Sequence, residues 1–201
     1  KQLATIEGLT GIEVSNYGNE SNGKEVGKIL SDNGLACSCI NINIACRRIY
    51  GRGSLSNTNP TVRRQAIDEC KAALDYAESL GADVVNLWPG QDGFDYALCT
   101  DFGRMYDDFL NGVVEIADHN KNVKVALEFK PREPRNRSLV DSAGTALLMS
   151  MDSGRDNVGV CVDVGHVLYA NANMAHAVEM CGRRGKLFHM HTNDCLGCWD
   201  D

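Results

Sequence analysis

The chain has 201 residues, with 20 basic and 27 acidic side chains and a formal net charge of −7, and its length indicates one domain. Its 43% hydrophobic and 6% aromatic content is typical of a globular domain and excludes disordered, collagen-like and coiled-coil classes. The acidic balance has the wrong sign for neutralising phosphate backbones, so we expect no nucleic-acid partner, and no apolar run reaches the ~18 residues of a membrane span.

Nine cysteines are an odd number in a chain that is long enough to bury a core without a disulfide framework. We therefore expect reduced thiols and a cytoplasmic protein. The sequence begins at Lys1 with no signal-peptide pattern and stops at Asp201 with no closing helix. We expect residues 1–201 to form a single domain that is truncated at both ends.

Short apolar runs rich in Val and Ile alternate with longer segments of helical period, which is typical of a parallel α/β fold. Six runs predict strands, which we place at residues 11–16, 35–44, 82–88, 123–130, 158–163 and 186–192. Five segments between them predict helices, at residues 24–33, 60–80, 102–120, 139–150 and 172–182. The second helix is the clearest, because Pro60 suits a first turn and Gly81 suits a helix stop. Strand and helix are expected to alternate without exception.

Six such units fit either an open doubly wound sheet or most of a (β/α)8 TIM barrel. An open sheet usually carries a glycine-rich phosphate loop after its first strand, and the sequence has no such motif. Instead, four consecutive predicted strands end in residues of ligand or acid–base type, at 86–88, 128–130, 163–166 and 189–191. Because barrels carry functional residues at the C-terminal ends of many strands, this pattern favours a TIM barrel.

The polar strand ends predict a divalent metal site. Successive strand residues alternate between faces, so Glu128 and Lys130 share one face, as do His189 and His191. Charged residues inside a barrel are costly unless they are paired or bound to metal. Two carboxylates and an imidazole at one mouth, Glu128, Asp163 and His191, suit Mn²⁺, Co²⁺ or Mg²⁺ better than a structural thiolate zinc site.

Each of these residues also has a structural interpretation. Glu128 could be a salt-bridge partner, Asp163 could cap the turn before His166, and either histidine of the last strand could be a hydrogen-bonded core residue. Lys130 could form a plain ion pair, although a lysine beside a metal site can also donate protons or stabilise an oxyanion. The occurrence of three ligand types at equivalent strand ends favours the metal site.

A zinc knuckle is a competing interpretation of the C-terminal segment. His189 and His191 precede Cys195 and Cys198, which have CxxC spacing. A single CxxC beside HxH lacks its second half at a normal finger spacing, so we favour the site at the strand ends.

Four segments resemble the xylose-isomerase-like TIM barrels, which include aldose–ketose isomerases, ketose 3-epimerases and the endonuclease IV group. The resemblance extends from about Gly11 to the end of the chain. The segments are GADVVNLWPGQDGFD at residues 81–95, LEFKPREP at 127–134, DVGH at 163–166, and HTND at 191–194 followed by WDD at 199–201.

This resemblance implies one or two bound metal ions. Glu128, Asp163 and His191 would hold the first ion with a carboxylate from an eighth strand. If these residues end strands five, six and seven, the chain is an incomplete barrel of strands two to seven, and the eighth lies beyond it. His166 and Asp200 would bind a second ion.

The resemblance further implies a sugar isomerase that interconverts an aldose and a ketose by a metal-assisted hydride shift. Glu128, Lys130 and His166 would be catalytic, and Trp88 would contact the sugar together with Lys130 and His166. A ketose 3-epimerase using proton transfer and a non-catalytic sugar-binding barrel are the alternatives, and the acidic charge disfavours an endonuclease. No histidine precedes His119, which departs from xylose isomerases that open the sugar ring near strand two. We expect a monosaccharide substrate and a homo-oligomer, either a dimer or a tetramer.

Overall fold

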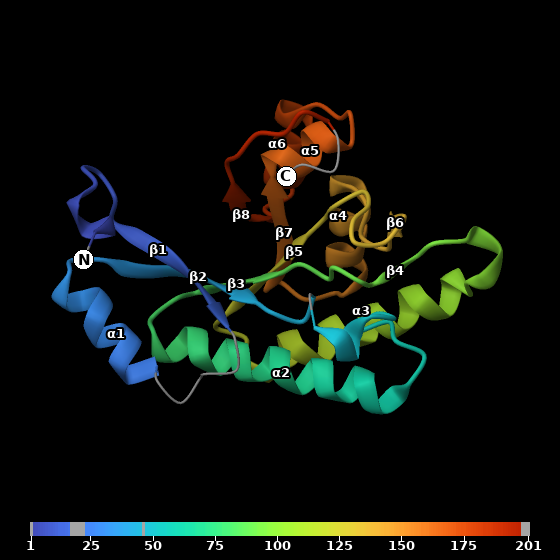
Figure 1. The fold of residues 1–201 in the computed structure, drawn as a ribbon, viewed down its shortest axis with the longest axis horizontal. Coiled ribbons are helices and arrows are strands. Elements are labelled where there is room, and N and C mark those ends of the chain that lie inside the picture. The colour runs from blue at the N-terminus through green and yellow to red at the C-terminus, as the bar shows by residue number, and fades with distance from the viewer. Residues whose placement is uncertain (1, 17–22, 46, 198–201) are drawn as a thin grey trace.

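The computed structural model describes residues 2–16, 23–45 and 47–197, and its centre is a curved sheet of six parallel strands (Figure 1). The order of the strands across the sheet follows their order in the chain. These strands are β1 (Gly11–Asn16), β2 (Ala36–Ile42), β3 (Val84–Leu87), β5 (Lys124–Glu128), β7 (Val158–Asp163) and β8 (Leu187–His191). All six predicted strands are present, and β1 and β7 have the predicted bounds.

Helices cover the outer face of this sheet. The predicted helices are found as α1 (Gly23–Asp32), α2 (Pro60–Ser79), α3 (Phe102–His119), α4 (Ala143–Asp152) and α6 (Met174–Gly182), and 3₁₀ turns occur at η1 (Leu3–Thr5), η3 (Arg48–Tyr50) and η4 (Ala97–Cys99). Helix α2 begins where the side chain of Asn59 accepts a hydrogen bond from the Thr61 amide, and it stops before Gly81, which has a φ of 73°. Within the described ranges, no helix combines the length and apolar character that crossing a membrane requires.

The expectation that strand and helix alternate without exception was wrong in two places. A short antiparallel ribbon, β4 (Gly93–Phe94) with β6 (Arg137–Ser138), joins the loops that follow β3 and β5. A helix of six residues, α5 (Val164–Tyr169), follows β7 directly and precedes α6. The predicted helix at 139–150 begins later, at Ala143, because Ser142 caps it by accepting a hydrogen bond from the Thr145 amide.

The sheet curls far enough for side chains on its two edge strands to meet. Glu13 of β1 lies 3.2 Å from the Nε2 atom of His189 in β8. In a flat sheet five strand spacings of ~4.8 Å would separate these strands by about 24 Å. The curvature confirms the predicted fold class, an incomplete TIM barrel, and it makes an inner face on which polar groups converge.

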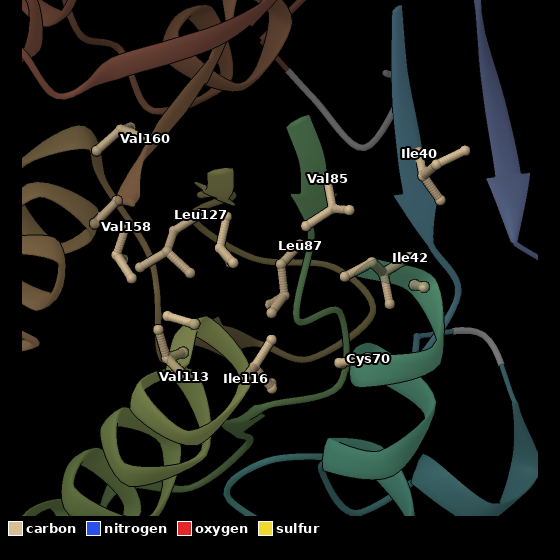
Figure 2. Packing of buried hydrophobic residues seen from close by; sticks show 14 of the residues in the cluster. Ile40, Ile42, Cys70, Val85, Leu87, Val113, Ile116, Leu127, Val158 and Val160 are labelled. Carbon is tan, nitrogen blue, oxygen red and sulfur yellow. The ribbon is translucent and has the colours of Figure 1, made fainter. Parts of the chain in front are cut away.

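The two faces of the sheet carry different side chains. Figure 2 shows Leu127 and other aliphatic residues of the outer face packing against helices α2 and α3, with Val113 and Ile116 contributed by α3. The inner cluster consists of smaller residues, with Phe188 packed against it: Cys39, Val84, Ala126 and Cys161. Gly159 is required beneath Phe188, because a β-carbon at that position would overlap the phenylalanine ring.

Candidate metal and sugar site

The structure brings the three predicted metal ligands together at the C-terminal edge of the sheet. Glu128, Asp163 and His191 are the last residues of β5, β7 and β8. The His191 Nδ1 atom lies 3.4 Å from Glu128 Oε1 and 3.4 Å from Asp163 Oδ2. Asp163 pairs with His191, and Glu128 pairs with Cys161, two residues before Asp163, so residues far apart in the sequence lie at one edge of the sheet.

His166 joins the same group because α5 starts immediately after β7. Asp163 caps this helix, since its Oδ1 atom accepts a hydrogen bond of 2.9 Å from the His166 amide. The helix turn then places His166 Nδ1 3.3 Å from Glu128 Oε1 and 3.8 Å from Asp163 Oδ1. Asp163 is therefore a helix cap, as its structural interpretation predicts, and its other oxygen, Oδ2, faces His191.

The donor set fits a divalent cation. Glu128, Asp163 and His166 are 5%, 4% and 7% exposed, and their ligand atoms lie within 4.8 Å of one another. Buried carboxylates need a compensating charge, and oxygen with imidazole donors is a combination that Mn²⁺, Co²⁺ and Mg²⁺ accept. The arrangement would thus let these side chains bind a cation without a thiolate.

Charge within the cluster has the sign that a cation site needs. Burial would raise the pKa of Asp163, but the hydrogen bond from His191 and the charge of His166 outweigh it and lower that pKa. The pKa of His191 is raised, chiefly by its hydrogen bond to Asp163. Burial raises the pKa of Cys161, which adjoins His191, to about 12, so this side chain is a neutral thiol at pH 7. The carboxylates thus hold positive charge at the place where a cation would bind.

Two asparagines that the sequence analysis did not assign to the site orient its carboxylates. Asn86, the third residue of β3, donates a hydrogen bond of 2.5 Å to Glu128 Oε2, which leaves Oε1 facing the histidines. Asn193 lies 3.3 Å from Asp163 Oδ2 and accepts a 2.6 Å hydrogen bond from the Gly165 amide. Asn86 belongs to the polar segment 86–88 at the end of a predicted strand, and Asn193 follows the predicted ligand His191 by two residues, and these positions are the signal that the sequence offers.

Trp88 and Lys130 form a pair next to the cluster. Lys130 is 5% exposed, and its ammonium lies 5.5 Å from the centre of the Trp88 ring. The same ammonium lies 2.6 Å from the Glu133 carboxylate. An aromatic ring and a buried ammonium group thus pair with each other in the segments that directly follow β3 and β5.

The whole described chain agrees with one family of known proteins. The family model for the xylose isomerase-like TIM barrel matches residues 2–199. The chain belongs to this xylose isomerase-like family. The likeness stated from the four sequence segments is thereby confirmed.

Three individual relatives show how similar this xylose isomerase-like protein is to known members of the family. A xylose isomerase of Thermus thermophilus is 28% identical over 172 residues, which cover 83% of this chain and 44% of that enzyme. A D-psicose 3-epimerase solved with D-fructose superposes with a TM-score of 0.75 at 22% identity, over 92% of this chain and 63% of that one. The zinc-bound IolI protein gives a TM-score of 0.75 at 18% identity, over 100% of this chain and 70% of that one. The chain thus spans less than half the length of the xylose isomerase that it matches.

The loop that carries Trp88 in this xylose isomerase-like chain is anchored by a buried carboxylate. Asp92 is fully buried and accepts hydrogen bonds from the amide and hydroxyl groups of both Ser54 and Ser56. Burial raises the pKa of Asp92 despite these bonds. Asp92 therefore joins the loop after β3 to the segment after β2 and fixes the base of the Trp88 wall.

The remaining predicted residues are only partly placed. Asp200, the predicted partner of His166 at a second ion, lies outside the described residues, as does Cys198 of the alternative zinc knuckle. The thiol of Cys195 donates a 3.3 Å hydrogen bond to the Gly165 carbonyl. His189 turns to Glu13, a residue that the sequence analysis did not assign to the site. Among the described residues, Cys195 and His189 thus have different partners.

Proposed function

We propose that the protein is a divalent-metal-dependent sugar isomerase that interconverts an aldose and a ketose. The observation that carries this proposal is the buried Lys130 above Trp88, next to a cluster of carboxylates and imidazoles. Similarity to a xylose isomerase over 83% of the chain supports the same reaction class.

In this proposal Glu128, Asp163 and His191 hold one cation, and His166 with Asp200 holds a second. A bound divalent cation would act as a Lewis acid and polarise O1 and O2 of the sugar, the oxygens on the two carbons between which the hydride moves. The ions that suit these donors are Mn²⁺, Co²⁺ and Mg²⁺.

The protein's own side chains would bind and orient the open-chain sugar. The reaction moves a hydride from C2 to C1, while the proton on O2 is lost and O1 gains one. The Lys130 ammonium would stabilise the negative charge that develops on O1. Trp88 would pack on the apolar face of the sugar and exclude water from the migrating hydrogen.

A ketose 3-epimerase is the second candidate. The observation that favours it is the buried Glu128, whose Oε1 atom faces imidazoles on two sides and could remove the proton from C3 of a ketose, while a second carboxyl group from an eighth strand returns a proton to the opposite face. Proton transfer of this kind needs one bound cation and would make no use of Asp200.

The test is an isotope experiment with the full-length protein, Mn²⁺ and a panel of aldoses that carry deuterium at C2, with EDTA as the control. The proposed isomerase gives ketose that retains deuterium at C1, and EDTA abolishes the reaction. Ketose without deuterium would contradict the hydride shift and indicate an enediol intermediate. If no aldose is converted, a panel of ketoses is incubated with the protein and Mn²⁺ in D₂O, and deuterium entering C3 of a ketose would establish the epimerase.

A further inference from the structure

The strongest unassigned feature is a carboxylate that reaches the proposed metal site from the opposite edge of the sheet. Glu13 stands in the middle of β1, and its Oε2 atom lies 3.2 Å from His189 Nε2 and 3.1 Å from His191 Nε2. The three side chains are between 19% and 24% exposed, so water screens these contacts only weakly. One carboxylate oxygen therefore serves two imidazoles.

The two nitrogens of His191 have different partners. Nε2 meets Glu13, whereas Nδ1 lies 3.4 Å from both Glu128 Oε1 and Asp163 Oδ2. The ring thus connects the Glu13 carboxylate with the buried carboxylates at the strand ends. A carboxylate cannot donate a hydrogen bond, so the contact at 3.1 Å places a proton on Nε2. The carboxylates beside Nδ1 favour a proton on that nitrogen as well while no cation is bound, and a cation that binds there would take the place of this proton. The ring would then be the Nε2-protonated tautomer, with the Nδ1 lone pair on the side of the cation.

We propose that Glu13 is a positioning residue of the metal site, acting on His191. It holds His191 with Nε2 protonated and Nδ1 free to bind the cation, and this inference rests on the proposed metal-dependent function. Ligand histidines commonly donate their other N–H group to a carboxylate, which fixes the ring and makes it a stronger ligand. His189 donates to the same oxygen of Glu13 and limits the freedom of that carboxylate.

An alternative arrangement uses the same atoms. Glu13, His189 and His191 offer ligand atoms within 4.8 Å of one another and could form a cation site of their own. His191 would then bind through Nε2, and its Nδ1 atom would carry a proton or a second ion. The tautomer and the bound nitrogen of His191 therefore separate the two arrangements.

The first experiment measures Mn²⁺ affinity in the full-length protein by titration, with the electron paramagnetic resonance signal of the free ion as readout. Loss of the carboxylate in Glu13→Ala is expected to weaken binding by about 10–100-fold, the usual effect of removing such a partner. Glu13→Gln keeps an acceptor oxygen without the charge, and we expect an intermediate affinity. Mn²⁺ binding by Glu13→Ala at the wild-type affinity would overturn the proposal.

A matched control separates positioning from general stabilisation. Glu69 of α2 is also a partly buried carboxylate, 30% exposed, with hydrogen bonds from Gln65, Tyr50 and Arg47. Glu69→Ala removes a comparable group from the outer layer and should leave Mn²⁺ affinity unchanged. A loss equal to that of Glu13→Ala would contradict the proposal. If Glu13→Ala does not fold, the comparison is made with Glu13→Gln and Glu69→Gln.

The second experiment reads the ring directly, by long-range ¹H–¹⁵N correlation spectra of the zinc-loaded protein. The chain has five histidines, and the His191→Gln spectrum assigns the one in question. The proposal predicts a proton on Nε2 and metal on Nδ1, and metal on Nε2 would overturn it in favour of the alternative site. Wild-type protein that binds Mn²⁺ tightly yet converts no sugar would contradict the proposed function and leave this inference standing.

Discussion

The outer and inner faces of the sheet differ in what their side chains do, although both faces are formed by the same strands. Outer side chains pack against helices, and inner side chains form the candidate site. Leu127 points outward and is fully buried against helices, while its neighbour Glu128 points inward to the histidines. Val160 and Cys161 divide in the same way. Outer positions gain stability from large apolar side chains, whereas inner positions accept small and charged ones at a cost that bound cations or hydrogen bonds must offset. The difference indicates that stability and chemistry can be changed separately, one residue apart.

The largest stability effect should come from the outer face. Leu127→Ala removes a fully buried side chain and should lower the free energy of unfolding by about 2–5 kcal/mol. Urea denaturation of wild type and variant measures this change. Leu148→Ala is the control, because Leu148 of α4 is 52% exposed and should shift stability by less than about 0.5 kcal/mol. Equal effects of the two substitutions would contradict the assignment of the core.

One residue further on, the expected effect moves from stability to chemistry. Glu128→Gln keeps the shape of the side chain but removes the charge of a proposed ligand. We expect sugar turnover with Mn²⁺ to fall by more than about 100-fold, beyond the range seen when only a supporting partner is lost. Steady-state kinetics with urea denaturation in EDTA checks both properties. If Glu128→Gln lowered the free energy of unfolding as much as Leu127→Ala does, the inner face would contribute to stability as the outer face does, and the comparison would fail.

A smaller effect on stability, together with an effect on substrate binding, is expected at Asp92, the buried carboxylate that anchors the loop of Trp88. In Asp92→Asn an amide nitrogen replaces one carboxylate oxygen and cannot accept the hydrogen bonds that this oxygen receives, either those of Ser54 at Oδ2 or those of Ser56 at Oδ1. Unsatisfied buried donors should lower the free energy of unfolding by about 1–3 kcal/mol. Thermal unfolding measures the loss, and KM for the sugar should rise because the loop of Trp88 is released. An unchanged KM would show that the anchor does not position Trp88.

The smallest effect is expected on the exposed side of the helical layer. Glu115 of α3 pairs with Arg64 and Lys71 of α2, and the hydrogen bonds from these side chains lower the pKa of Glu115 to about 2. A lowered carboxyl pKa contributes stability above about pH 4.5, and that stability is lost as the pH falls towards 2. Because Glu115 is 38% exposed, Glu115→Gln should cost under about 1 kcal/mol at pH 7. The difference from wild type should disappear near pH 2, and urea denaturation at both pH values tests it.

Much of the fold could be predicted because the strands have strong apolar runs. β1 and β7 match their predicted bounds, but the predicted strand 35–44 ends at Ile42, the last residue of β2 that pairs with β1. The ribbon of β4 and β6 has two residues in each strand, too few for any period to be visible. Length and pattern therefore decided which elements the sequence revealed.

The residues of the candidate site likewise divide into those that the sequence pattern predicts and those that it does not. Glu128, Asp163 and His191 could be predicted to meet because each ends a strand of one parallel sheet, and the C-terminal ends of such strands lie at the same edge. Glu13 could not, since it lies in the middle of β1 and reaches His191 only because the sheet curls. Curvature arises from the packing of the whole sheet and leaves no local sequence signal.

Gly159 and Phe188 place a constraint on how this protein can evolve. The ring of Phe188 occupies the space that a side chain at position 159 would need. A mutation at either codon alone leaves an overlap or a void, so the two positions are free to vary only as a pair, with a larger residue at one matched by a smaller residue at the other. Two residues on neighbouring strands, 29 positions apart in the sequence, are thus expected to change together.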